Sequence, residues 1–154
     1  MKKLLLLPLL LILFSCSSEE GPKDPIVGTW KYVKYLDYPV NSEEVLTKEA
    51  SKCQLLTRMT FRKSNNLTTS YYINNPLNGE CDVNTSATKH DLSWEKLSDG
   101  QYRIYSEEYP KGSLYNVDFI GDSEMRFIWN RTYTKYTTEG EFTIEKSEEV
   151  YIRI

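Results

Sequence analysis

Histidine is nearly absent from this sequence, since His90 is the only one among 154 residues. The chain also lacks a Gly-x-Ser-x-Gly elbow, a glycine-rich phosphate loop and any set of His or Cys with metal-ligand spacing. His90 stands beside Asp91 after a polar stretch, which predicts a surface histidine next to a carboxylate rather than a general base. We therefore expect no catalytic residue, no metal and no cofactor, and the chain is not predicted to be an enzyme.

An excess of basic residues is missing too, because 19 Lys and Arg face 22 Asp and Glu for a net charge of −3. Proteins that bind nucleic acids depend on clustered Lys and Arg that neutralise phosphates. Nucleic acid is therefore not an expected partner.

Long hydrophobic runs are confined to the start of the chain, where Leu4 to Phe14 is apolar apart from Pro8. A membrane-spanning helix needs about 20 apolar residues, so this run is too short to span the bilayer. It follows Lys2 and Lys3, and a basic start before a short apolar run is typical of a signal peptide. We expect residues 1–15 to be a signal peptide.

The run ends at Leu13-Phe14-Ser15-Cys16, which resembles the lipobox of bacterial lipoproteins. The resemblance implies cleavage before Cys16 and attachment of diacylglycerol and a fatty acid such as palmitate to that residue. Two or three acyl chains hold a protein stably, at about 0.8 kcal/mol per buried methylene. Cys16 is thus the expected lipid anchor, and polar residues 16–25 the expected flexible tether. The alternative is an ordinary secretory signal with an incidental cysteine.

Glu19-Glu20 follows the cysteine closely and resembles the signal that sends some Gram-negative lipoproteins to the outer face of the outer membrane. This resemblance implies an outer-membrane protein exposed on the cell surface. The alternative is a periplasm-facing protein whose acidic pair only solvates the tether.

Beyond the anchor only two cysteines remain, Cys53 and Cys81. An even number in an oxidising compartment predicts that they form a disulfide. A metal site with two thiolates is the competing interpretation, but no further Cys or His cluster completes a tetrahedron.

Residues 26–154 are enough for one domain with a core but few for two. They divide into short segments rich in β-branched and aromatic residues, separated by turn residues, which is an all-β pattern. One helix is expected over Glu43 to Lys52, with Asn41 or Ser42 as its cap. The expected strands are residues 29–36, 55–63, 67–73, 89–96, 101–106, 113–120, 124–133, 141–146 and 148–154.

Consecutive hairpins along the whole domain favour an antiparallel up-and-down barrel of eight to nine strands, with a two-sheet sandwich as the alternative. Tyr115, Val117 and Phe119 alternate with polar residues, so one face of each strand is expected to point inward. An interior of eight strands has room for side chains or for one small ligand.

Gly28-Thr29-Trp30 opens the first strand, and this Gly-x-Trp motif resembles the lipocalin-like domains of bacterial lipoproteins. The resemblance implies that Trp30 closes one end of the barrel beneath an arginine from a late strand. Arg153 is the preferred arginine and Arg131 the other candidate. The resemblance also implies binding of a small hydrophobic molecule.

Three Trp and twelve Tyr are many for so short a chain. These side chains combine an apolar body with a polar group, so they suit a binding cavity. The alternative is an interaction module of the cell envelope, in which they fill the interior and the barrel contacts a partner protein or glycan. The candidate ligand-lining residues are Trp94, Tyr102, Tyr115 and Trp129.

Cells grown with radioactive palmitate should label the protein, and Cys16→Ala should abolish that label because it removes the acylated residue. The measurement is autoradiography of the immunoprecipitated protein. Equal labelling of the two forms would contradict the anchor.

Overall fold

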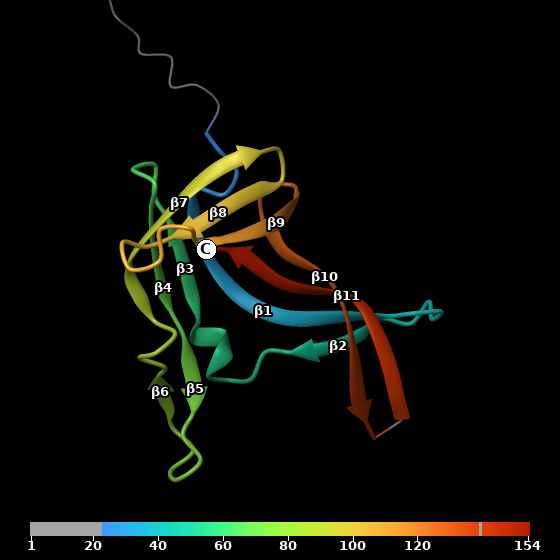
Figure 1. Cartoon of the computed structure of the whole chain (residues 1–154). Helices are drawn as coiled ribbons and strands as arrows, with labels where there is room; N and C mark the ends of the chain where they lie inside the picture. The colour runs from blue at the N-terminus through green and yellow to red at the C-terminus, as the bar shows by residue number, and fades with distance from the viewer. Residues whose placement is uncertain (1–22, 139) are drawn as a thin grey trace, which may run out of the picture.

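The computed structural model describes residues 23–138 and 140–154, which form a closed antiparallel barrel (Figure 1). Within this part of the chain, eight strands close the barrel, and one further strand pairs with part of the first barrel strand. Each barrel strand pairs with the next along the chain, and the last pairs with the first, so the topology is up-and-down. The barrel strands are β1 (Gly28–Pro39), β3 (Arg58–Phe61), β4 (Asn66–Ser70), β7 (Lys89–Ser98), β8 (Gln101–Tyr105), β9 (Ser113–Ile120), β10 (Glu124–Thr137) and β11 (Gly140–Arg153).

Two accessory pieces extend the barrel at one end. Strand β2 (Leu46–Glu49) pairs with the second half of β1, and a separate hairpin joins β5 (Tyr72–Asn74) to β6 (Cys81–Val83). In Figure 1 this hairpin lies on the opposite side from the long ends of β10 and β11, with β2 between them. We call this end of the barrel, where the β5–β6 hairpin and the long ends of β10 and β11 diverge, the open end.

The opposite end, the closed end, is sealed by Trp30 and Arg153. The guanidinium of Arg153 lies 4.2 Å from the Trp30 ring centroid, and the indole Nε1 donates to the carbonyl of Ile26 at 2.7 Å. Arg153 also donates to the carbonyls of Val27, Pro25 and Asp122, at 2.8, 2.7 and 2.6 Å. These hydrogen bonds to the carbonyls of residues 25–27 hold the entering chain across the closed end of the barrel.

Gly28 is required at the closed end. Its φ is +155°, and a Cβ built on it would lie 2.3 Å from a guanidinium nitrogen of Arg153. Since that guanidinium is fixed by three carbonyl partners and the Trp30 ring, it has little freedom to move aside. The Gly-x-Trp spacing therefore has a steric basis.

The core lies beneath Trp30 and extends along the barrel interior. It is built from inward side chains of every barrel strand, as the alternation predicted. The residues buried in this cluster are Ile26, Val27, Trp30, Met59, Phe61, Leu67, Trp94, Tyr102, Val117, Met125, Phe127 and Tyr151.

The all-β barrel prediction is confirmed, and residues 113–120 form a strand with the predicted bounds. The predicted helix over Glu43 to Lys52 is wrong. Leu46–Glu49 is strand β2, and the helical turn is a 3-10 segment, η1, at Gln54–Leu56. Pairing satisfies backbone groups along the second half of β1 that would otherwise form a bare edge, so a tertiary contact overrides the local helix signal.

The last two predicted strands, residues 141–146 and 148–154, are one continuous strand, β11. Ser147, which separated them in the sequence, is fully buried, and its hydroxyl donates to Asp37 Oδ1 at 2.7 Å. A satisfied buried hydroxyl does not interrupt a strand.

The predicted disulfide between Cys53 and Cys81 is confirmed. The two residues are 28 apart in sequence, and the bond ties the start of η1 to the β5–β6 hairpin at the open end. The predicted signal peptide, the anchor Cys16 and most of the tether lie outside the described residues.

Arg153→Ala should lower the free energy of unfolding by about 2 to 3 kcal/mol, because it removes three carbonyl contacts and the stacking on Trp30. Arg62→Ala is the matched control, since Arg62 is exposed and its side chain donates to Thr68 Oγ1 at 3.2 Å. We expect the control to change stability by less than about 0.5 kcal/mol. Urea unfolding monitored by tryptophan fluorescence measures both, and equal effects would contradict the sealing role of Arg153.

Candidate functional site

A hollow of about 230 Å³ lies inside the barrel on the side of the open end. Residues from β3, β4, β7, β8, β9, β10 and β11 contribute to its wall, so it belongs to the barrel interior. Most of this wall is apolar. The lining residues are Met59, Leu67, Thr69, Tyr71, Ala87, Leu92, Ile104, Tyr115, Phe127, Trp129, Glu149 and Tyr151.

Two further hollows, of about 210 and 390 Å³, continue from this inner hollow toward the open end. The middle hollow shares Tyr71, Glu149 and Tyr151 with the inner one, and the outer hollow shares Tyr32 and Glu149 with the middle one. Glu149 therefore lines all three, at the point where the barrel interior meets the open end.

Aromatic rings form one wall of the inner hollow. Phe127 and Trp129 lie in consecutive inward positions of β10, with their rings stacked at 6.3 Å between centroids. Tyr115 of β9 meets Phe127 edge-on at 5.3 Å. This wall offers apolar area and ring faces to a ligand.

Glu149 lies on β11, the neighbouring strand, where it pairs with Phe127 of β10. It accepts a hydrogen bond from the Tyr151 hydroxyl at 2.8 Å. Burial raises its pKa above the ordinary value, and the Tyr151 bond and the charge of Arg131 offset this effect only in part. Among the described residues, no Lys or Arg nitrogen lies within 4.0 Å of this carboxylate.

Tyr32, Tyr71 and Tyr151 line the same hollows as Glu149. Burial together with the charge of Glu149 raises the pKa of Tyr32 and of Tyr71 to about 12. Burial likewise raises the pKa of Tyr151 well above its usual value. All three phenols therefore stay protonated at neutral pH, and the Tyr151 hydroxyl donates its proton to Glu149.

Asp37, which lines the outer hollow, has its charge compensated by the protein. Its carboxylate accepts bonds from Lys135 Nζ, Tyr133 Oη and Ser147 Oγ at 2.5, 2.5 and 2.7 Å. Burial alone would raise the pKa of Asp37, but these three bonds outweigh it and lower the pKa.

Glu148 is compensated in the same way on the other face of β11. Lys146 and Arg126 lie 2.5 and 2.9 Å from its oxygens, and Tyr38 donates at 2.9 Å. These partners lower the pKa of Glu148 although burial raises it. Glu149 thus differs from both other acids in having no cation at contact distance.

The structure separates the four predicted ligand-lining residues. Tyr115 and Trp129 line the inner hollow. Trp94 and Tyr102 instead pack against each other in the filled closed half, with ring centroids 6.1 Å apart. Tyr102 donates to Asp24 Oδ1 at 2.9 Å, so it helps hold the entering chain rather than a ligand.

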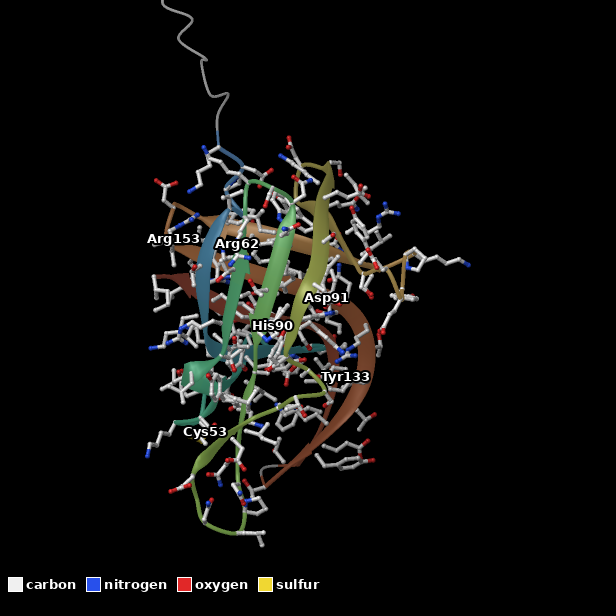
Figure 2. All side chains as sticks on the ribbon, turned by 90° about the vertical axis from the view of Figure 1, so that its left-hand side faces the viewer. Cys53, Arg62, His90, Asp91, Tyr133 and Arg153 are labelled. Carbon is white, nitrogen blue, oxygen red and sulfur yellow. A yellow bond between two sulfur atoms is a disulfide. The ribbon has the colours of Figure 1, made fainter. Side chains whose placement is uncertain are left out.

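The other residues considered in the sequence analysis, His90, Asp91 and Arg131, do not line the inner, middle or outer hollow. His90 and Asp91 are exposed on β7, and Figure 2 shows both on the outside of the barrel wall. Arg131, the other candidate to cover Trp30, is exposed on β10 with its guanidinium 5.4 Å from the Tyr133 ring. Within residues 23–138 and 140–154, no cluster of three His, Cys, Asp or Glu is placed to hold a metal.

Glu149 was not among the predicted site residues, yet the sequence contains a signal for it. If Arg153 points inward over Trp30, alternation along the strand places Tyr151 and Glu149 on the same inward face. The polar sequence of this strand obscured that signal, because a run of Glu, Lys and Ser is more typical of a solvated surface.

No family model matches the sequence, and no curated protein is significantly similar to it. In the described part of the chain, no helix is long and apolar enough to cross a membrane.

Glu149→Gln should become increasingly stabilising, relative to the native protein, as the pH rises from 4 to 8. The folded-state pKa of Glu149 is raised, so the native protein binds the proton more tightly than the unfolded chain, whose glutamates titrate near 4.3. The cost of ionising the buried group appears as pH rises through the raised pKa, and Gln never incurs it.

The same hollows also contain the charged groups Asp37, Lys48 and Lys135, and both proteins retain them. Glu145→Gln, on the exposed face of β11, is the control and should show a nearly constant difference. Urea unfolding at each pH gives the free energies. A difference for Glu149→Gln that stays flat or shrinks with pH would contradict the burial of an uncompensated charge.

Proposed function

We propose that this protein is an outer-membrane lipoprotein whose barrel binds one small, mostly apolar ligand at its open end. The observation that carries the proposal is the inner hollow, walled by Tyr115, Phe127 and Trp129 and by aliphatic side chains. Burial of a ligand against these surfaces would supply affinity, at roughly 25 cal/mol per Å² of apolar area.

The size of the hollow sets the size of the ligand. An apolar protein cavity of about 150 Å³ holds benzene, so a hollow of about 230 Å³ suits one ring with a short substituent. The middle hollow, of about 210 Å³, offers room for a longer chain to extend toward the open end.

The position of the chain entry supports an anchored arrangement. Residues 24–27 cross the closed end, where Asp24 accepts the Tyr102 hydroxyl bond and Arg153 binds the Val27 carbonyl. A lipid on Cys16 would hold that end toward the membrane. The open end would then face away from the membrane, either into the medium or into the periplasm according to the leaflet, where a diffusing ligand could enter.

The alternative role as an interaction module needs a filled barrel. The closed half meets that description, since Trp94 and Tyr102 are buried there. The open half contains the hollow and therefore favours ligand binding.

Binding of 2-phenylethanol, a neutral ring with a short chain, tests the proposal. We expect saturable binding to the native protein in ligand-observed NMR, with quenching or a shift of the tryptophan emission. Ala87→Trp should reduce the affinity at least tenfold, because Ala87 lines the hollow and a Trp side chain would occupy it.

Leu77→Trp is the matched control, because it adds the same side chain at a position that is 94% exposed on the β5–β6 loop. It should leave binding unchanged, and circular dichroism should show that both variants are folded. Absence of binding to the native protein, or equal binding to the Ala87→Trp variant, would overturn the proposal.

A further inference from the structure

The inner hollow contains one charged side chain, Glu149. Every other lining residue is apolar, aromatic or a neutral hydroxyl. A single acidic group in an otherwise apolar site selects for the charge and the hydrogen-bonding group of the ligand, because an unmatched charge in that environment is costly.

The protein supplies only part of what this carboxylate can bind. An ionised carboxylate has about four lone-pair positions for donors. Tyr151 occupies one of them, and no described cation reaches the group. Lys135 binds Asp37 in the outer hollow, and Arg126 and Lys146 bind Glu148 on the other face of β11. Glu149 is therefore available to a donor that comes from outside the protein.

The rings around the hollow favour the same kind of partner. A cation is attracted to the faces of Trp, Tyr and Phe, and Phe127, Trp129 and Tyr115 form the wall of this hollow. An anionic ligand would instead meet the Glu149 charge with no Lys or Arg in the lining of the inner hollow to compensate it.

The geometry points to a primary ammonium ligand of the arylalkylamine type, with its ring against Phe127 and Trp129 and its ammonium group on Glu149. This inference rests on the proposed function, since it names the chemical class of the ligand that the hollow binds. The hollow takes one ring and a short chain, and Glu149 lies at the passage to the open end, so the amine would point outward.

Three probes of nearly equal size distinguish the possibilities: phenethylamine as the cation, 2-phenylethanol as the neutral probe and 3-phenylpropanoate as the anion. Isothermal titration at pH 7.5 and low salt measures all three with the native protein. Charge-assisted hydrogen bonds are stronger than neutral ones, so phenethylamine should bind roughly tenfold tighter than 2-phenylethanol. The anion should bind most weakly.

Glu149→Gln keeps the size and polarity of the side chain while removing its charge. It should weaken phenethylamine binding roughly tenfold and change 2-phenylethanol binding less than about twofold. Glu145→Gln removes the same charge from the exposed face of the same strand and should change neither value. This control separates contact with the ligand from the general effect of net charge.

The outcomes separate this inference from the proposed function. Binding of 2-phenylethanol without a preference for the amine would overturn the inference and leave the proposed function standing. An equal loss of both probes in Glu149→Gln, or an equal loss of amine affinity in Glu145→Gln, would also overturn it. Failure of every probe to bind the folded native protein would overturn both.

Discussion

The pairing of β1 with β11 is the constraint on which the rest of the structure depends. It runs from Trp30 opposite Arg153 to Pro39 opposite Ile144, and it joins the first barrel strand to the last. Without it, a strongly twisted sheet would leave two long edges with unpaired backbone groups. With it, the sheet has an inside and an outside, and the alternation of each strand assigns every side chain to one of them.

Closure alone does not make the two ends of the barrel alike. At one end Trp30, Arg153 and residues 24–27 cross the opening, so aromatic side chains fill the interior beneath them. At the other end the wall diverges, because β10 and β11 continue past their neighbours while the chain leaves β4 at Tyr71, whose N–H bonds the Thr88 hydroxyl instead of a strand. Side chains from diverging strands cannot meet across the axis, and the hollows remain.

The parts of this arrangement that follow local rules could be predicted from the sequence. Alternation gave the strand of residues 113–120 and placed Tyr115 and Trp129 on the inward face, where they line the hollow. Alternation shows which side chains point inward but not how deep they lie along the barrel axis. Trp94 and Tyr102 point inward as Tyr115 and Trp129 do, but they fill the closed half instead of lining the hollow.

The helix expected over Glu43 to Lys52 is wrong for a different reason, since Leu46–Glu49 forms a strand by pairing with β1. The sequence does not distinguish Glu149 from its neighbour Glu148. The two acids differ in their binding partners, because Glu148 contacts Arg126 and Lys146 whereas Glu149 contacts only the Tyr151 hydroxyl.

The buried acids of the barrel differ in whether a cation compensates their charge. Burying a carboxylate is tolerated where cations and hydroxyls compensate it, as at Asp37 with Lys135 and at Glu148 with Arg126 and Lys146. Glu149 is held at the inner hollow with a single phenol as its partner, although Arg131 is only two strand positions beyond Trp129 and is turned toward the Tyr133 ring instead. Sites that violate the rule of compensated charge are where a protein gives up stability for function. A ligand that brings its own positive charge would restore that rule, and in doing so would stabilise the folded barrel.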